Sequence, residues 1–268
     1  MAIRKLYLRT LLRSALKIIF LAELDKQMSD DHIVSSFDED MSRLEAMFLE
    51  MGEIVIEQLK SATRALRKED RALAKQVVKG DKQLNKMEAS LNDLAIKILA
   101  LRQPFAGDLR KVVITLKSAG HLERIGDLTR NMAQRTNTIT KASADTGPIE
   151  TLIRMSEIVQ EMVASIMLAY KTRDTELAIK VRAQDETVDT SHNALFREML
   201  TYMMEDLRNI SGCMHVMFMA KNIERMGDNI ADIAKELIYM NTGDWPAGKR
   251  SKSDRTSKII LDPDQIQE

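Results

Sequence analysis

Two pairs of carboxylates, each pair four residues apart, stand out in this chain as groups that could bind a cation. The pairs are Glu123 with Asp127 and Glu224 with Asp228, inside the similar segments LERIGD and IERMGD. On a helix, side chains at this spacing share one face, one turn apart. Like charges so placed destabilise a helix by about 0.2–0.5 kcal/mol. A local penalty that occurs twice implies that something else relieves it.

A second set of pairs lies upstream of each motif at the same spacing. Asp81 precedes Asn85, and Asp185 precedes Asp189. If these pairs lie on helices antiparallel to the motif helices, each upstream pair converges with one motif pair on a shared patch. Clustered carboxylate oxygens with little nitrogen or sulfur suit Mg, Ca, Mn or Fe rather than structural zinc. The predicted metal ligands are Asp81, Glu123, Asp127, Asp185, Asp189, Glu224 and Asp228.

Other interpretations of these residues remain open at this point. An acidic pair on a helix is most often a solvated surface, and the neighbouring Arg124 and Arg225 offer ion pairs that would make the motif purely structural. His192, two turns from Asp185, is a further candidate ligand, with Glu88 as the corresponding candidate in the first half. The other histidines are interpreted as incidental.

The residue patterns of common enzymes are missing from the sequence. Carboxylate-bridged di-iron bundles need Glu-x-x-His on two helices, whereas Asp189 and His192 form the similar Asp-x-x-His only once. There is no P-loop, no glycine-rich dinucleotide turn, and no Ser or Cys with an evident base. We therefore expect a protein that is not an enzyme.

The composition favours long helices. Of 268 residues only 4% are aromatic, and the chain has 10 Gly and 4 Pro. The 40 basic and 40 acidic residues cancel, which argues against a nucleic-acid partner. The single cysteine, Cys213, excludes an internal disulfide and fits a reducing cytoplasm.

Periodic apolar residues predict helices over about 37–68, 70–102 and 105–141, and the second half repeats this pattern. Matching residues of the first two helices are shifted by 104, as from Asp81 to Asp185. Those of the third are shifted by 101, as from Glu123 to Glu224. We predict an all-α tandem repeat of two three-helix bundles, with six long antiparallel helices.

These patterns divide the chain into four parts. Residues 37–145 form the first repeat, and residues 146–241 form the second. Residues 1–36 are an N-terminal extension, in which residues 1–27 carry a basic amphipathic pattern. That pattern is typical either of a membrane-surface helix or of an added upstream start. Residues 242–268 are expected to be a flexible tail.

Over about residues 37–241 the chain resembles the PhoU family of phosphate-transport regulatory proteins. The similarity is carried by several short segments in addition to the two acidic motifs. They are Arg102-Gln103-Pro104, Asp108-Leu109-Arg110 and Tyr202-Met203-Met204-Glu205-Asp206.

The resemblance implies a cytoplasmic, non-catalytic negative regulator of phosphate uptake and of phosphate-starvation signalling. Its expected partners are the ATPase subunit of the phosphate ABC transporter, a sensor histidine kinase and a second copy of the chain. It further implies that the predicted carboxylates hold divalent or ferric ions (Mg, Mn, Fe, Ca or Zn), with Asn85 as a departure in the first repeat. The alternative is a metal-independent scaffold whose acidic patches dock a basic partner surface.

Overall fold

The computed structural model describes residues 36–139, 146–248, 253–256 and 259. These residues form long helices and one short 3-10 turn, and no strand occurs among them, which confirms the predicted all-α class. The first helix covers residues 36–67 of the described chain. The others are α2 (Arg71–Arg102), α3 (Ala106–Ile139), α4 (Thr146–Thr172), α5 (Thr175–Glu205) and α6 (Ile210–Thr242), with the turn η1 at Leu207–Asn209.

Matching aspartates start the second helix of each repeat. The Asp70 carboxylate accepts hydrogen bonds from the backbone N–H of Ala72 and Leu73, at 2.9 and 3.0 Å. Asp174 accepts one from Leu177 at 2.9 Å. Such caps satisfy N–H groups that lack a partner at a helix start. Because both helices start at matching residues, Asp81 in α2 and Asp185 in α5 occupy equivalent positions.

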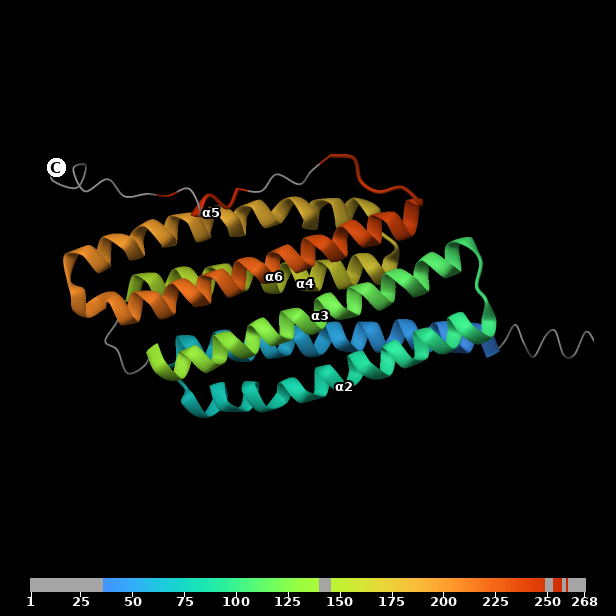
Figure 1. The fold of residues 1–268 in the computed structure, drawn as a ribbon, viewed down its shortest axis with the longest axis horizontal. Helices are drawn as coiled ribbons and strands as arrows, with labels where there is room; N and C mark the ends of the chain where they lie inside the picture. Colours follow the sequence, from blue (N-terminus) through green and yellow to red (C-terminus); the bar gives the residue numbers. More distant parts are fainter. Residues whose placement is uncertain (1–35, 140–145, 249–252, 257–258, 260–268) are drawn as a thin grey trace, which may run out of the picture.

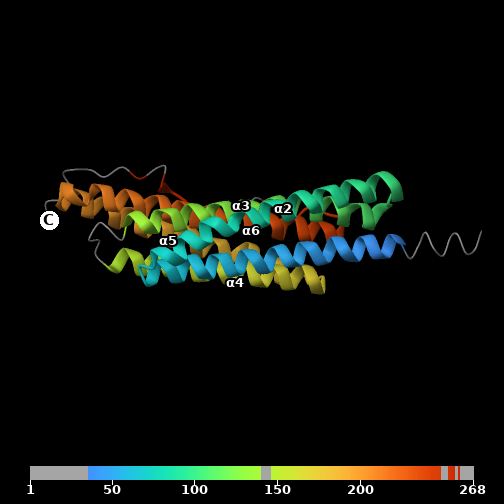
Figure 2. The ribbon, with the colours of Figure 1, turned by 90° about the horizontal axis from the view of Figure 1, so that it is seen from below.

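The helices form two layers (Figures 1 and 2). One layer contains α2, α3, α6 and α5 side by side in that order, so the third helices of the two repeats meet at its centre. The helix of residues 36–67 and α4 form the other layer. Each repeat therefore contributes half of both layers, and each second helix lies beside its third helix, as expected.

One apolar core fills the space between the layers and extends through both repeats. Phe48 in the first repeat and Tyr170 in the second lie in ring contact, with 4.5 Å between their centroids. Gly52 meets the Met167 side chain so closely that a Cβ would overlap its sulfur. The two bundles predicted from the repeat thus share a core.

The predicted terminal segments lie largely outside the described residues. This holds for residues 1–35, including the basic amphipathic pattern over 1–27, and for residues 260–268. Within the tail, residues 253–256 do lie against the helices, where they form hydrogen bonds with α5. In the described chain no helix is long and apolar enough to cross a membrane.

Candidate metal centre

The first cluster, defined as Asp81, Glu88, Glu123 and Asp127, lies between α2 and α3. Asp81 is buried, and the other three are half-buried. Gly126 allows the two helices to meet here, because a Cβ at this position would overlap the Leu84 side chain and lie 3.7 Å from the Asp81 carboxylate. The glycine of the motif thus brings the predicted acids of the two helices together.

Burial and mutual repulsion within the first cluster both act on the Glu123 carboxyl. Burial, followed by the charges of Asp127, Glu88 and Asp81, raises the pKa of this carboxyl above its ordinary value. The nearby Arg124 guanidinium opposes the increase. A positive ligand that entered the cluster would relieve this repulsion.

Arg130 supplies part of that positive charge in the structure. Its guanidinium Nη1 donates to Asp81 Oδ2 at 2.5 Å and lies 2.9 Å from Asp127 Oδ1. Arg124 reaches Asp127 Oδ2 from the other side at 3.5 Å. The other oxygen of Asp81, Oδ1, is buried and has no hydrogen-bond partner among the described residues. Buried polar atoms are nearly always paired, so Oδ1 marks a place where a ligand atom or a cation would fit.

The second cluster, defined as Asp185, Asp189, Glu224 and Asp228, lies at the matching place between α5 and α6. It is more deeply buried than the first, since Asp185, Asp189 and Glu224 are 0%, 1% and 2% exposed. Gly227 again sits at the closest approach, where a Cβ would overlap Asp185 Oδ1. The four predicted ligands of the second repeat therefore gather in one place.

A lysine of α6 lies beside this cluster. Lys221 Nζ lies 2.9 Å from Glu224 Oε2 and 2.8 Å from Asp254 Oδ2 in the tail. Burial raises the pKa of Glu224 above its ordinary value, although the neighbouring Lys221 ammonium opposes this. His192 is also buried here, with Nδ1 3.7 Å from Asp254 Oδ1. Burial lowers the pKa of this imidazole, more strongly than the neighbouring carboxylates raise it.

The two repeats use different residues for the same electrostatic task. Arg130 corresponds to Ala231 in the second repeat, and Lys221 corresponds to Gly120 in the first. Each cluster thus receives its cationic side chain from a different turn of its third helix. The internal repeat predicted the carboxylates that match between halves, as Asp81 matches Asp185 and Glu123 matches Glu224, and it missed both cations because they do not match.

The donor set fits a hard cation in chemistry, although the present arrangement is adapted to basic side chains. The clusters offer mainly carboxylate oxygens, the preferred ligands of Mg, Ca and Mn. No group of three or more His, Cys, Asp or Glu side chains in the described chain is placed so that it could hold a metal ion. A cation would therefore enter by displacing Arg130 or Lys221 and by turning carboxylates toward itself.

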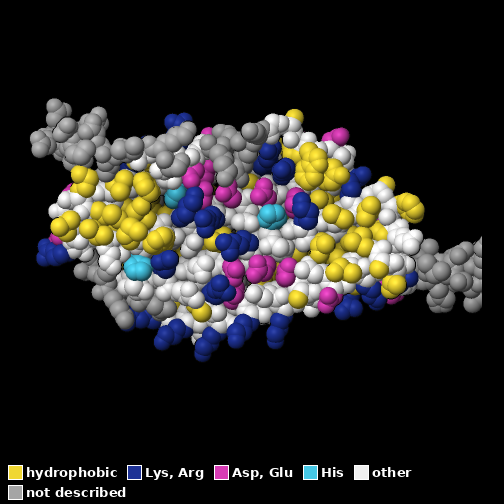
Figure 3. Space-filling model, in the orientation of Figure 1, with side chains coloured by type: hydrophobic (Ala, Val, Ile, Leu, Met, Phe, Trp, Pro, Cys, Tyr) yellow, Lys and Arg dark blue, Asp and Glu magenta, His cyan; other side chains and the backbone are white. Residues whose placement is uncertain are grey.

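Exposed acidic side chains gather on one face of the molecule, whereas Asp185, Asp189 and Glu224 of the second cluster are buried. In the space-filling view, acidic side chains gather in two groups near the centre of this face, over the layer that contains α2, α3, α6 and α5 (Figure 3). Basic side chains lie between the groups, and apolar side chains gather toward both ends. A partner that binds this face would meet acidic, basic and apolar side chains.

The seam between α3 and α6, which separates the clusters, carries a further buried carboxylate. Glu236 Oε2 accepts a hydrogen bond from Ser118 at 2.9 Å, and Glu236 Oε1 lies 2.7 Å from Lys117 Nζ and 3.7 Å from His121 Nε2. The neighbouring Glu236 carboxylate is the main reason why the pKa of His121 is raised. His121, interpreted as incidental from the sequence, thus helps to join the two repeats.

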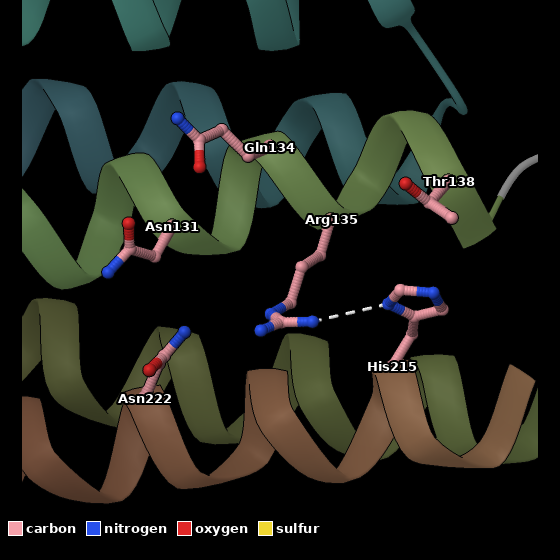
Figure 4. Close-up of a pocket in the computed structure, with 6 residues that line it drawn as sticks. All are labelled: Asn131, Gln134, Arg135, Thr138, His215 and Asn222. Atoms are coloured by element: carbon pink, nitrogen blue, oxygen red, sulfur yellow. Dashed lines mark hydrogen bonds between the residues drawn. The ribbon is translucent and has the colours of Figure 1, made fainter. Parts of the chain in front are cut away.

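Farther along the seam lies a polar pocket of about 420 Å³ that is separate from both clusters. Arg135 Nη1 points toward His215 Nδ1 across the pocket, at 3.2 Å (Figure 4). The same guanidinium stacks on the Phe218 ring, 4.4 Å from its centroid. The pocket contains none of the predicted ligands, and its lining residues are Asn131, Gln134, Arg135, Thr138, His215 and Asn222.

Together, the fold and the site define a class of protein: an all-α chain of two three-helix repeats, each with a carboxylate cluster between its second and third helices. The family model described as the PhoU domain matches residues 48–136 and 152–237, one match in each repeat. The chain therefore belongs to the PhoU domain family.

Similar proteins agree with this assignment over nearly their whole lengths. The chain is 39% identical over 232 residues to a protein of Rhizobium meliloti named phosphate-specific transport system accessory protein PhoU homolog, covering 87% of this chain and 98% of the relative. A protein of the same name from Caulobacter vibrioides is 38% identical over 228 residues, with 85% and 99% covered.

Solved structures show the same fold. The crystal structure of PhoU from Pseudomonas aeruginosa is similar with a TM-score of 0.75 and 35% identity, covering 78% of this chain and 100% of that one. The phosphate transport system regulatory protein PhoU from Streptococcus pneumoniae gives a TM-score of 0.72 at 28% identity, with 79% and 99% covered. The tandem three-helix architecture predicted from the repeat is confirmed.

Proposed function

We propose that this chain is a regulatory accessory protein of phosphate uptake whose two carboxylate clusters bind cations. The observation that carries the proposal is the pair of carboxylate clusters at matching places in the two repeats, each with a raised carboxyl pKa at its third-helix glutamate. The names of the relatives support the phosphate-transport part. The cation part is supported by the oxygen-rich donor sets and by the unpaired Asp81 Oδ1.

In this function the protein acts in the cytoplasm as a negative regulator and catalyses no reaction. It connects the phosphate ABC transporter, through its ATPase subunit, to a sensor histidine kinase, and it works as a homodimer. Bound divalent or ferric ions change the charge of the two clusters. Since charge complementarity governs how such surfaces meet, the cations set which partner docks.

A second candidate function is favoured by the ion pairs themselves. Arg130 and Lys221 show that each cluster accepts a basic side chain, at 2.5 Å from Asp81 and 2.9 Å from Glu224. A partner that presents Lys or Arg residues could dock on the same carboxylates without any metal. In this case the protein is a metal-independent scaffold.

A binding experiment separates the two candidates. The purified chain is tested for capture of the transporter's ATPase subunit, with Mn²⁺ present and after treatment with a chelator. Cation-dependent docking predicts that the chelator reduces capture, and that Glu224→Gln/Asp228→Asn reduces it as well. Chelator-insensitive capture that the double variant still weakens would instead show the metal-independent scaffold.

The control for this experiment is a matched acidic pair outside the clusters. Glu53 and Glu57 are exposed, lie four residues apart on the first helix and belong to neither cluster. Glu53→Gln/Glu57→Gln changes the net charge by the same amount as the cluster variant. Equal loss of capture in both double variants would contradict a specific role for the clusters.

A further inference from the structure

The tail segment, defined as residues 253–256, lies on α5 directly over the second cluster. Its backbone passes the buried Asp189 carboxylate, whose Oδ2 accepts hydrogen bonds from the N–H of Ser253 at 2.9 Å and of Asp254 at 3.2 Å. The segment lies beyond residues 152–237, where the family model matches the second repeat. These contacts therefore involve a part of the chain that the family match does not cover.

One turn further along α5, Asn193 holds the main chain of the segment at two points. Its Nδ2 donates to the Ser253 carbonyl at 2.5 Å, and its Oδ1 accepts from the Arg255 N–H at 2.9 Å. With the two bonds to Asp189, four main-chain groups of the segment are bound by only two side chains. In peptide-binding sites, hydrogen bonds to the main chain of the bound segment contribute affinity.

Side chains add selectivity to the main-chain contacts. Asp254 Oδ2 lies 2.8 Å from Lys221 Nζ, and the Ser253 hydroxyl donates to Glu186 Oε1 at 3.0 Å. The other oxygen of Asp254 accepts from the N–H and the hydroxyl of Thr256, at 3.0 and 2.7 Å. That local turn fixes the segment in its bound shape, and a pre-organised ligand binds with less loss of conformational entropy.

The first repeat serves as an internal comparison, because it lacks each of these features. Asp189 corresponds to Asn85, which is exposed and neutral. Asn193 corresponds to Ala89, and Lys221 corresponds to Gly120. A carboxylate as buried as Asp189 requires donors or a cation, whereas an exposed amide does not. The second repeat alone has both the need for a covering segment and the residues to hold one.

We propose that α5 and α6 form a binding site for a short segment of the type Ser-Asp-x-Thr, and that residues 253–256 fill it within the same chain. A filled site also weakens cation binding at the second cluster, because the segment occupies Asp189 and holds Lys221 beside Glu224. This second statement rests on the proposed cation function, whereas the docking of the segment does not.

Docking of the segment changes two measurable quantities, the exchange rate of its amides and the affinity of the second cluster for a cation. If the segment docks with equilibrium constant K, its amides exchange with solvent more slowly by the factor 1 + K. If a cation binds only while the segment is undocked, its apparent dissociation constant is raised by the same factor. The exchange protection of the segment and the weakening of cation binding should therefore agree in size.

The test compares the wild-type chain with Ser253→Pro and Asn193→Ala. Proline has no N–H to donate to Asp189, and Ser253 lies outside every helix, so the bundle should stay folded. Asn193→Ala removes both main-chain bonds from the other side. The control is Arg255→Ala, because the structure shows only a backbone contact for this exposed residue. Helix content by circular dichroism confirms that each variant is folded.

The first readout is hydrogen exchange at the Asp254 and Arg255 amides in metal-free protein, corrected for intrinsic rates. Protection is expected in the wild-type chain and in Arg255→Ala, and its loss in Ser253→Pro and Asn193→Ala. Wild-type amides that exchange at the rates of the two variants overturn the proposal, whatever the cation does.

The second readout is Mn²⁺ binding measured by electron paramagnetic resonance. Ser253→Pro should bind Mn²⁺ at the second cluster more tightly than the wild-type chain, by the measured protection factor. Equal Mn²⁺ affinity in the two chains overturns the weakening of cation binding at the cluster. A protected segment combined with no Mn²⁺ binding by Ser253→Pro supports the docking and contradicts the proposed cation function.

Discussion

At the scale of single residues, the ionised Glu123 side chain is unfavourable in the folded chain. Its carboxyl is surrounded by Asp127, Glu88 and Asp81, and burial and these charges raise its pKa. At neutral pH the ionised carboxylate is therefore less favourable in the folded chain than in the unfolded chain, which lowers the free energy of unfolding. A ligand of opposite charge would remove this electrostatic penalty.

A neutral substitution at this position makes the penalty measurable. Glu123→Gln should raise the free energy of unfolding at pH 7 without added cations by about 0.2–0.5 kcal/mol, because one like-charge interaction is lost. Since the pKa is raised in the fold, the gain is full above this raised value and disappears as the pH falls below the ordinary 4.5. Urea unfolding at several pH values checks this, and a loss of stability at pH 7 would show that the carboxylate is well paired.

At the scale of helices, the glycines of the two motifs set how closely the second and third helices approach. Gly126 packs on Leu84, and Gly227 packs on Asp185, at matching places in the repeat. Gly120, in the same helix as Gly126, has open space around it. The glycine within E-R-I/M-G-D therefore has a packing reason, which is to bring the carboxylates of neighbouring helices together.

Alanine substitutions should separate these two situations. Gly120→Ala should stabilise the protein by up to about 1 kcal/mol, because alanine is the better helix former. Gly227→Ala has the same propensity gain, but its Cβ overlaps the Asp185 carboxylate, and overpacking costs about 1–3 kcal/mol. A net loss of stability is expected, which thermal unfolding would measure. If both variants were stabilised equally, the close approach of α5 and α6 would be disproved.

At the scale of the whole molecule, the two repeats behave as one body because they share a core. Apolar contacts run from the first helix to α4, and the α3–α6 seam is tied by Ser118 and Glu236.

A shared core predicts a single cooperative unfolding transition. Leu84→Ala in the first repeat and Leu195→Ala in the second remove fully buried side chains, and each should cost about 2–5 kcal/mol. Both variants should lower one common Tm in scanning calorimetry. Two resolved transitions, of which each variant shifts only its own, would show instead that the repeats unfold independently.

The fold could be predicted from the sequence because the two halves of the chain carry the same residue pattern. Asp81 and Asp185, or Glu123 and Glu224, match at constant shifts, and apolar periodicity fixed which face each helix buries. The unmatched residues escaped prediction: Arg130, Lys221 and the tail segment have no counterpart in the other half. Their roles depend on which turns of neighbouring helices meet, which long-range packing determines. The metal ligands themselves remain a prediction.

Equilibrium binding of Mn²⁺ tests the central claim most directly. The wild-type chain, Glu123→Gln/Asp127→Asn, Glu224→Gln/Asp228→Asn and the control Glu53→Gln/Glu57→Gln are titrated under identical conditions and followed by electron paramagnetic resonance. We expect the wild-type chain and the control to bind Mn²⁺ alike, and each cluster variant to lose the Mn²⁺ binding of its own cluster. Mn²⁺ binding that is absent from the wild-type chain, or unchanged in both cluster variants, would contradict the central claim.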